Sequence, residues 1–302
     1  MVGVVFGSLT PAEELAAGAR AAEQAGFTEQ WFSEDCFFSG GLSGVAQLLA
    51  STADVKAGLG LVSVVARHPA VLAMEIAGLA RMHPGRLRVA VGLGSESWVR
   101  QMGLMPSKPL TAVRETVGVL RDLLGGKTVD RATVAHEFHG IALDLPPAEV
   151  PEIWVGAVNE KALKASSEFA DGVLLSVLAG ESYLRWASSL TALPKTAYVL
   201  TAVDDDPAVA RDAVRDAVGF FLRAERHSAL VTQSRYADEI ADGVVPDHWI
   251  DEYAAAGTPE HVTERLRALR AAGADSLGLW LFPPERLTQQ IERVASEVLP
   301  RL

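Results

Sequence analysis

The segment KAGLGLVSVVARHPAVLAMEIAGLARMHPGRLRVAVGLG, residues 56–94, contains a complete strand–helix–strand unit. Residues 56–65 and 86–94 are short apolar runs rich in valine, which is typical of buried strands. Between them, residues 69–85 begin with a proline and end with Pro-Gly, the usual signals for the start and the end of a helix. Because both strands are too apolar to face water, the unit predicts parallel strands covered by helices.

The same alternation continues along most of the chain. Eight strand–helix units in 302 residues have the size of a (β/α)8 TIM barrel. The chain has no Pro/Gly/Ser-rich linker that would divide it, so we predict one α/β barrel domain over residues 1–302. A doubly wound open sheet with an extra domain is the alternative. The six further strands are predicted at residues 2–6, 29–33, 152–157, 171–176, 195–203 and 275–282.

Two stretches interrupt the alternation and predict insertions in the barrel. After the fourth strand, a helix at 109–124 leads into a small hairpin within residues 125–147. After the seventh strand, residues 206–256 predict a long helical region, broken at Gly243 and Pro246. We expect this second insertion and the loop at 95–108 to select the substrate.

The composition excludes several classes of partner. The net charge of −11 leaves no basic surface for non-specific nucleic-acid binding. No apolar run approaches the ~18 residues of a membrane span, and the first residues do not resemble a signal peptide. One cysteine excludes an internal disulfide and a multi-cysteine zinc site. We expect a cytoplasmic protein that binds a small-molecule substrate, with no nucleic-acid or membrane partner.

Chemistry in a barrel is carried by residues at the carboxyl ends of the strands. The stretch WFSEDCFF, residues 31–38, places Glu34 and Asp35 at such an end. Adjacent side chains on an extended chain point to opposite faces, and no spaced set of histidines accompanies them, so we predict no metal site. Cys36 is flanked by negative charge, which disfavours a reactive thiolate, and no G-x-S-x-G motif is present.

The loop after the fourth strand carries a weak phosphate-binding signal, and the loops after the fifth and sixth strands carry a stronger one. VGLGSES follows the fourth strand, but it lacks the third glycine of a dinucleotide-binding loop. VNEKALK, residues 158–164, opens a helix directly after the fifth strand, and LLSVLAG follows the sixth. Backbone N–H groups at these neighbouring junctions, together with Lys161, predict a possible phosphate cradle.

Several segments together resemble the bacterial luciferase-like superfamily, in the same order over nearly the whole chain. The most telling are Arg67-His68-Pro69 after the third strand and FADGVLL at residues 169–175. WFSED, EIWVGAVNEKALKASSEFADGVLLS and AAAGTPEHVTERLRALRAAGAD add to the match. The resemblance is closest to the branch that uses the deazaflavin coenzyme F420, which includes methylenetetrahydromethanopterin reductases.

The resemblance implies a barrel that binds a flavin or deazaflavin at its carboxyl-terminal mouth, and a homodimer. It implies a non-prolyl cis peptide in the third strand, near Gly60-Leu61-Val62. Asn159-Glu160 stand where the family usually has Gly-Pro, and Glu34-Asp35 stand where many deazaflavin relatives have Asp-His. The positions that would bind the cofactor are Gly60, Leu61, Val62, Gly92, Leu93, Ala157, Val158, Asn159, Lys161, Ser176 and Val177.

The resemblance also implies the chemistry. We expect hydride transfer between reduced coenzyme F420 and a small organic substrate, as C=N or C=C reduction or the reverse. Such a reaction needs no protein nucleophile, but it needs one acid, which would be Glu34, Asp35 or Glu96. Two alternatives remain open at this point. One is an FMN-dependent monooxygenase that consumes oxygen, and the other is a barrel that binds a flavin-like ligand without catalysis.

Overall fold

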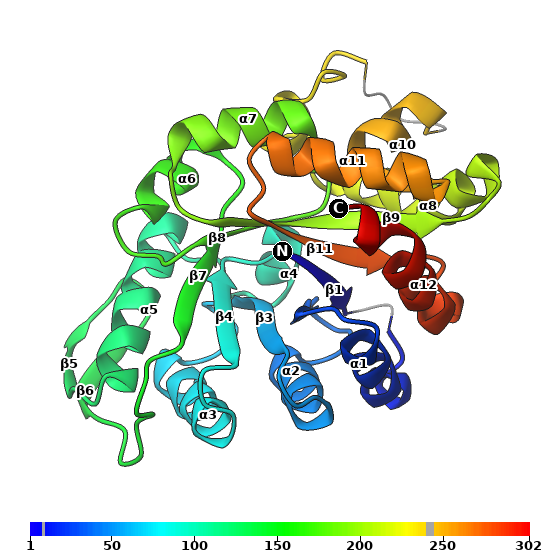
Figure 1. Cartoon of the computed structure of the whole chain (residues 1–302). Coiled ribbons are helices and arrows are strands. Elements are labelled where there is room, and N and C mark those ends of the chain that lie inside the picture. Colours follow the sequence, from blue (N-terminus) through cyan, green and yellow to red (C-terminus); the bar gives the residue numbers. More distant parts are fainter. Residues whose placement is uncertain (8–9, 240–244) are drawn as a thin grey trace.

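The computed structural model describes residues 1–7, 10–239 and 245–302, and within them eight parallel strands close into a barrel (Figure 1). Each strand pairs with its neighbours, and the last returns to pair with the first, for example Val2 with Leu277. The predicted (β/α)8 barrel is therefore confirmed. In order around the barrel, its strands are β1 (Val2–Phe6), β2 (Glu29–Phe32), β3 (Lys56–Ser63), β4 (Leu87–Gly92), β7 (Glu152–Gly156), β8 (Val173–Leu175), β9 (Lys195–Val203) and β11 (Ser276–Leu281).

Helices cover the outside of the barrel, and their ends follow local sequence signals. In α3, for example, Pro69 is the first residue, and Nδ1 of His68 accepts a hydrogen bond from the backbone N–H of Ala70. The helix ends at Met82, just before Pro84 and Gly85. The covering helices are α1 (Leu15–Gln24), α2 (Gly41–Ser51), α3 (Pro69–Met82), α5 (Pro109–Leu124), α6 (Glu160–Ser166), α7 (Glu181–Leu190), α8 (Pro207–Ala224), α11 (Pro259–Ala271) and α12 (Leu287–Arg293).

The insertion after β4 contains the expected hairpin. Strands β5 (Val129–Ala132) and β6 (Glu137–Ile141) pair antiparallel and lie beside α5, at the left of Figure 1. A short helix, α4 (Glu96–Gln101), forms in the segment that was expected as a loop.

The insertion after β9 differs from the prediction of a wholly helical region. It contains α8, then α9 (Ala229–Thr232) and α10 (Asp247–Tyr253), but residues 254–257 form a strand, β10 (Ala254–Gly257). The reason is that β8 has three residues and pairs only with the first part of β9, at residues 195–197. Strand β10 pairs with residues 200–203 of β9 and satisfies the backbone groups that β8 does not reach. Gly243, where a break was expected, lies outside the described residues.

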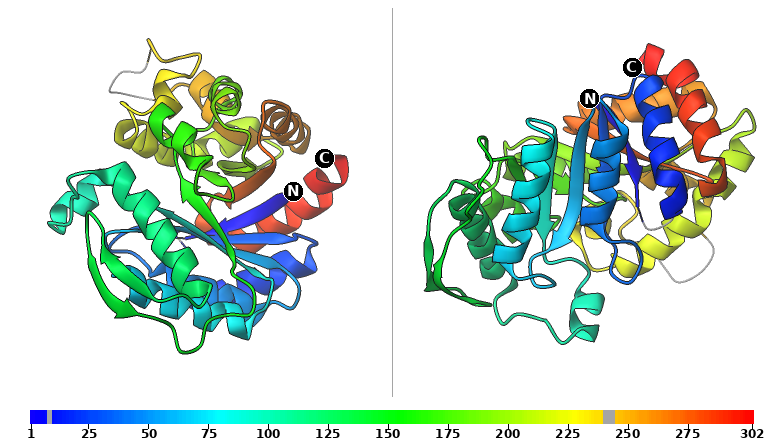
Figure 2. Two further views of the ribbon diagram at one scale, coloured as in Figure 1. Left: turned by 90° about the vertical axis from the view of Figure 1, so that its left-hand side faces the viewer. Right: turned by 90° about the horizontal axis from the view of Figure 1, so that it is seen from below.

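Aromatic rings fill the middle of the barrel by packing on glycines. A β-carbon on Gly58 would lie 2.2 Å from the ring of Trp31. A β-carbon on Gly172 would lie 2.4 Å from the ring of Trp154. Both tryptophans are almost completely buried. The two chain ends lie close together in both views of Figure 2, and the N-terminal amine donates a hydrogen bond to the carbonyl of Asp275.

We predict that Gly58→Ala destabilises the protein by about 1–3 kcal/mol, because the methyl group must displace the Trp31 ring in a filled interior. Gly118→Ala, within α5, is the matched control. The nearest atom to the β-carbon that it would add is Nη2 of Arg131 at 3.7 Å, an ordinary contact at the end of a flexible side chain, so it should raise stability by about 0.5–1 kcal/mol. Chemical denaturation of both variants measures the difference. Equal stability of Gly58→Ala and the wild type would show that the tryptophan does not depend on this glycine.

Candidate active site

The barrel interior is lined by glycines at the carboxyl ends of three neighbouring strands: Gly60 of β3, Gly92 of β4 and Gly156 of β7. A β-carbon on Gly60 would lie 2.6 Å from the hydroxyl oxygen of Tyr198, and one on Gly156 would lie 2.2 Å from Cδ2 of Leu61. These positions therefore accept no side chain unless a neighbour moves. Glycine here lets neighbouring side chains pack directly on the backbone of the wall, with Leu61 on Gly156 and the Tyr198 hydroxyl on Gly60.

Strand β3 carries an irregularity at this level. Its pairing with β4 changes register between Leu59 and Val62, and the Gly60–Leu61 peptide bond is cis. The non-prolyl cis peptide that the family resemblance implies at this position is thus confirmed. The half-buried side chain of Leu61 lies over Gly92 and Gly156, while Val62 is buried in the core and Leu93 is half-buried.

Three aromatic rings lie together, and two of them, Trp31 and Tyr198, lie beside Gly60. The centroid of the Trp31 ring is 6.1 Å from that of Trp154 and 6.0 Å from that of Tyr198. The Tyr198 hydroxyl donates a long hydrogen bond, 3.4 Å, to the carbonyl oxygen of Gly60. Burial, reinforced by the negative charges of Glu29 and Asp35, raises the pKa of Tyr198 well above its ordinary value, so the phenol stays neutral. Sequence analysis missed Tyr198, because a tyrosine within an apolar strand carries no signal beyond core packing.

Glu34 connects two loops and a helix. Its two carboxylate oxygens accept hydrogen bonds from the two terminal nitrogens of Arg67, each at 2.7 Å, and the backbone N–H of Gly41 donates to Oε2, also at 2.7 Å. The Glu34 side chain is only 8% exposed. A bidentate, charge-assisted pair of this kind is strong and fixes its geometry. Glu34 thus joins the loop after β2 to the loop after β3 and to the start of α2.

Asp35 shares the neighbour Cys36 with Glu34 and also acts on Tyr198. It is half-buried, and its negative charge contributes to the raised pKa of Tyr198 inside the barrel. The adjacent Cys36 is held as a neutral thiol, because burial and then the charges of Glu34 and Asp35 raise its pKa. This agrees with the expectation that Cys36 is not a nucleophile. Of the two carboxylates, Asp35 is the one whose charge contributes to the raised pKa of Tyr198.

Glu96, the third candidate acid, is the first residue of α4. Its Oε1 accepts a hydrogen bond from Nε of Arg100 at 2.9 Å, one turn further along the same helix. The side chain is 58% exposed. Glu96 therefore lies on a helix surface in contact with solvent, whereas Glu34 and Asp35 are partly or largely buried.

The loop after β7 is tied to two other elements. The carbonyl oxygen of Val158 accepts a hydrogen bond from the hydroxyl of Tyr183 at 2.8 Å, and Oδ1 of Asn159 accepts one from the backbone N–H of Ala229 at 2.9 Å. Ala157 is buried, and Lys161 is exposed on α6. The side-chain oxygen of Asn159 is thus engaged by the protein itself, a contact between residues 70 positions apart that no local pattern indicates.

The end of β8 leads to a buried carboxylate. Ser176 is half-buried and Val177 is buried, and Gly180 then precedes α7. A β-carbon on Gly180 would lie 2.3 Å from Oε1 of Glu252, whose other oxygen accepts a hydrogen bond from Nε of Arg235 at 2.8 Å. Burial raises the pKa of Glu252, although the charges of Arg265 and Arg235 oppose the shift. Sequence analysis did not single out this residue.

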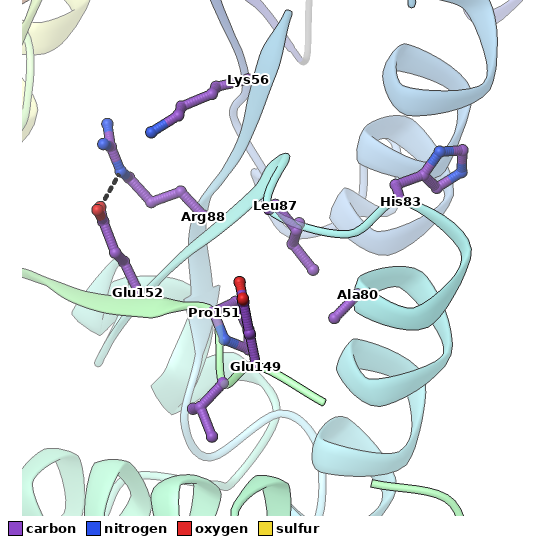
Figure 3. Close-up of a pocket in the computed structure, with 10 residues that line it drawn as sticks. Lys56, Ala80, His83, Leu87, Arg88, Glu149, Pro151 and Glu152 are labelled. Carbon is purple, nitrogen blue, oxygen red and sulfur yellow. Dashed lines mark hydrogen bonds and ion pairs between the residues drawn. The ribbon is translucent and has the colours of Figure 1, made fainter. Parts of the chain in front are cut away.

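A cavity of about 180 Å³ lies at the opposite, amino-terminal ends of β3, β4 and β7 (Figure 3). Arg88 lines this cavity. Its guanidinium donates hydrogen bonds to the carboxylates of Glu29, at 2.5 Å, and Glu152, at 2.6 Å. Lys56 and His83 also line it. In barrels this end carries stability rather than chemistry. We therefore interpret the Arg88 cluster as structural and place the candidate site at the other end, around Gly60 and Asp35.

Across residues 1–7, 10–239 and 245–302, no group of three or more His, Cys, Asp or Glu side chains is placed to hold a metal ion. Among the helices in these same ranges, none has both the length and the apolar character needed to cross a membrane.

Comparison with known proteins connects this geometry to a family. The sequence profile of the luciferase-like monooxygenase family matches residues 4–276. The 5,10-methylenetetrahydromethanopterin reductase of Archaeoglobus fulgidus is 26% identical over 320 residues, which cover 96% of this chain and 96% of that protein. The enzyme of the same name from Methanolobus tindarius is 26% identical, with 91% of this chain and 92% of that protein covered.

Solved structures share the fold from end to end. The coenzyme F420-dependent tetrahydromethanopterin reductase from Methanopyrus kandleri superposes with a TM-score of 0.85 at 21% identity, covering 99% of this chain and 98% of the other. An F420-dependent secondary alcohol dehydrogenase, in complex with an F420–acetone adduct, gives 0.82 at 21% identity, covering 100% and 98%. The FMN-containing oxygenating constituent of a Baeyer–Villiger monooxygenase from Pseudomonas putida gives 0.79 at 17% identity, also covering 100% and 98%.

We predict opposite pH dependences for two carboxylates. The raised pKa of Glu252 means that the folded state binds this proton more tightly than the unfolded chain does. The stability that Glu252 contributes is therefore full below about pH 4.5 and is lost as the pH rises through its folded pKa. At Glu23, burial raises the pKa, but hydrogen bonds from the N–H groups of Asp54, Ala53 and Val55 outweigh it and lower the pKa, so its contribution is lost as the pH falls.

Denaturation of Glu252→Gln and Glu23→Gln from pH 3.5 to 7 measures both effects against the wild type. The free-energy difference between wild type and variant should decrease with pH for Glu252→Gln and increase with pH for Glu23→Gln. Slopes of the same sign would contradict the assignment.

Proposed function

The chain belongs to the luciferase-like monooxygenase family, and on that basis we propose that it is an oxidoreductase that uses coenzyme F420. It would transfer a hydride between the reduced coenzyme and a small organic substrate, by C=N or C=C reduction or in the reverse direction. The observation that carries this proposal is the end-to-end similarity to the reductase of Archaeoglobus fulgidus, at 26% identity over 96% of both chains.

The residues at the barrel mouth fit a flat, ring-shaped cofactor. Leu61 lies directly on Gly156 and Gly92, because neither has a side chain, so the wall at this level presents a half-buried apolar side chain on which a flat ring can pack. When bound, the reduced deazaflavin supplies the hydride, and the protein binds, orients and excludes water. Gly60, Leu61, Val62, Gly92 and Leu93 would hold the ring, and Ala157, Val158, Asn159, Lys161, Ser176 and Val177 would hold the rest of the cofactor.

The proton that accompanies hydride transfer needs one acid within hydrogen-bond reach of the substrate. Glu34 has both oxygens bonded to Arg67, and Glu96 pairs with Arg100 on an exposed helix. Asp35 is half-buried at the end of β2, and its charge acts on Tyr198 inside the barrel. We assign proton transfer to Asp35, because it is half-buried beside the barrel interior whereas Glu96 lies on an exposed helix, and we assign to Glu34 the positioning of Arg67 and the start of α2.

We expect Asp35→Asn to lower kcat by about 100-fold or more, because an amide cannot donate or accept the proton. Glu96→Gln, on the exposed helix, should keep kcat within about twofold. Glu34→Gln should lower the melting temperature, because it removes the charge that Arg67 pairs with. Its effect on kcat should be smaller than that of Asp35→Asn. The measurement follows the deazaflavin absorbance with a panel of imines and conjugated alkenes, together with thermal denaturation. Full turnover by Asp35→Asn would overturn the assignment.

Two alternatives are separated by a single titration. The FMN-containing structural relative supports an oxygen-consuming monooxygenase as the second candidate. Purified protein is titrated with reduced F420 and with reduced FMN while dissolved oxygen is recorded. The proposal expects tight binding of F420 without oxygen uptake; oxygen uptake with reduced FMN would favour the monooxygenase. Binding of either cofactor without turnover of any substrate would favour a non-catalytic barrel.

The proposal includes a homodimer, which the family resemblance implies. In support, the outer face of α3 exposes Val71, Met74 and Met82, with Gly78 between the methionines, at a spacing that places them on one side of the helix. Contiguous exposed apolar surface of this kind is typical of protein–protein contacts.

We expect light scattering to give twice the mass of the chain for the wild type and the mass of one chain for Met74→Lys with Met82→Lys. Val209→Lys, at another exposed apolar position on α8, is the control and should leave the wild-type mass unchanged. A dimer that survives both methionine substitutions would place the interface elsewhere.

A further inference from the structure

The short helix α9 begins without help from its own cap residue. Ser228 stands at the N-cap position, but its side chain makes no capping bond, and its buried hydroxyl has no partner among the described residues. The first free N–H of the helix, on Ala229, instead donates to Oδ1 of Asn159 at 2.9 Å. Asn159 belongs to the loop after β7, so the acceptor comes from a different part of the barrel.

Helix α9 depends on contacts of this kind for its position. It has four residues, far fewer than a helix needs to persist alone in water. Its Leu230 and Val231 are buried, and α9 contacts α7. An uncapped N–H at this partly buried site would be left without the hydrogen bond that folding requires. The bond from Asn159 therefore contributes directly to docking the segment that follows α8.

The same loop is fixed from its other side. The carbonyl oxygen of Val158 accepts a hydrogen bond at 2.8 Å from the hydroxyl of Tyr183, a fully buried residue of α7. Burial, and then the negative charge of Glu225, raise the pKa of Tyr183, so the hydroxyl remains a donor. Residues 158 and 159 are thus held between α7 and α9. A movement of this loop must move α9 or break the bond to it.

We infer that Asn159 is a positioning residue that caps α9 from another element, so that a ligand bound at the loop after β7 and the docking of α9 stabilise each other. This inference rests on the proposed function, in which that loop holds part of the cofactor. The insertion after β9 would then become more firmly docked when the cofactor binds. By linkage, the factor by which the cofactor stabilises α9 equals the factor by which docked α9 strengthens cofactor binding.

Three variants separate the cap from other roles of the residue. Asn159→Ala removes the acceptor oxygen. Asn159→Asp keeps an oxygen in the same place and should preserve the bond. Ser228→Ala is the matched control at the same helix end, because the hydroxyl it removes has no partner in the described structure.

Hydrogen exchange at residues 229–232 is measured first without cofactor. We expect exchange about tenfold faster in Asn159→Ala, the effect of a lost cap, and wild-type exchange in Asn159→Asp and Ser228→Ala. Exchange in Asn159→Ala equal to the wild type would overturn the cap. Because no cofactor is present, this comparison is independent of the proposed function.

Oxidised F420 is then added, and its binding is followed separately by fluorescence. We expect bound F420 to slow exchange at residues 229–232 in the wild type and in Asn159→Asp, but not in Asn159→Ala. Because Asn159 is itself one of the proposed cofactor-binding residues, the exchange rates at residues 229–232, and not the Kd, decide the coupling. Binding of F420 to the wild type without any change in exchange would overturn the coupling. Failure of F420 to bind at all would refute the proposed function and the coupling, while the cofactor-free comparison still decides the cap.

Discussion

The packing of aromatic rings onto glycines inside the barrel is the constraint on which the rest of the structure depends. Trp31 and Trp154 fill the middle of the barrel only because Gly58 and Gly172 lack side chains at the points of contact. Protein interiors are packed too densely for both a ring and a β-carbon at such points. The Trp31 ring in turn lies beside Gly60, where β3 departs from regular pairing. The packing of the core therefore determines where the backbone of β3 lies at the candidate site.

A pair of adjacent carboxylates acquires two different roles on this framework. Glu34 is bonded to Arg67 and to the backbone of α2, which fixes the loop after β2. The next residue, Asp35, is half-buried, and its charge contributes to the raised pKa of Tyr198. The run of aromatic and acidic residues at 31–38 thus combines a core ring, a structural ion pair and a candidate acid within five residues. The ion pair explains how the loop can present Asp35 in a defined place.

The sequence predicts the strands and helices that carry a local apolar pattern. It does not predict elements and bonds that depend on residues far apart in the chain. Strand and helix periodicity identifies the barrel and the hairpin after β4, because each element carries its own apolar pattern. The strand at residues 254–257 is missed because Ala-Ala-Ala-Gly has no strand pattern; it forms because β9 has unpaired backbone groups beyond β8. The bonds from Arg67 to Glu34 and from Ala229 to Asn159 join residues 33 and 70 positions apart, so no local spacing indicates them. The cis peptide was expected only through family resemblance.

Strand β10 also changes how the insertion after β9 relates to the barrel. The chain leaves the wall at Val203 and re-enters it at Ala254, which pairs with Leu200 of the strand it left. Both ends of the insertion are therefore anchored to one strand, through backbone hydrogen bonds that do not depend on side-chain identity. The fifty residues between them, 204–253, form an insertion whose two ends are fixed next to each other. Because this pairing uses backbone groups, we expect changes of side chains within residues 204–253 to leave the register between β9 and β10 unchanged.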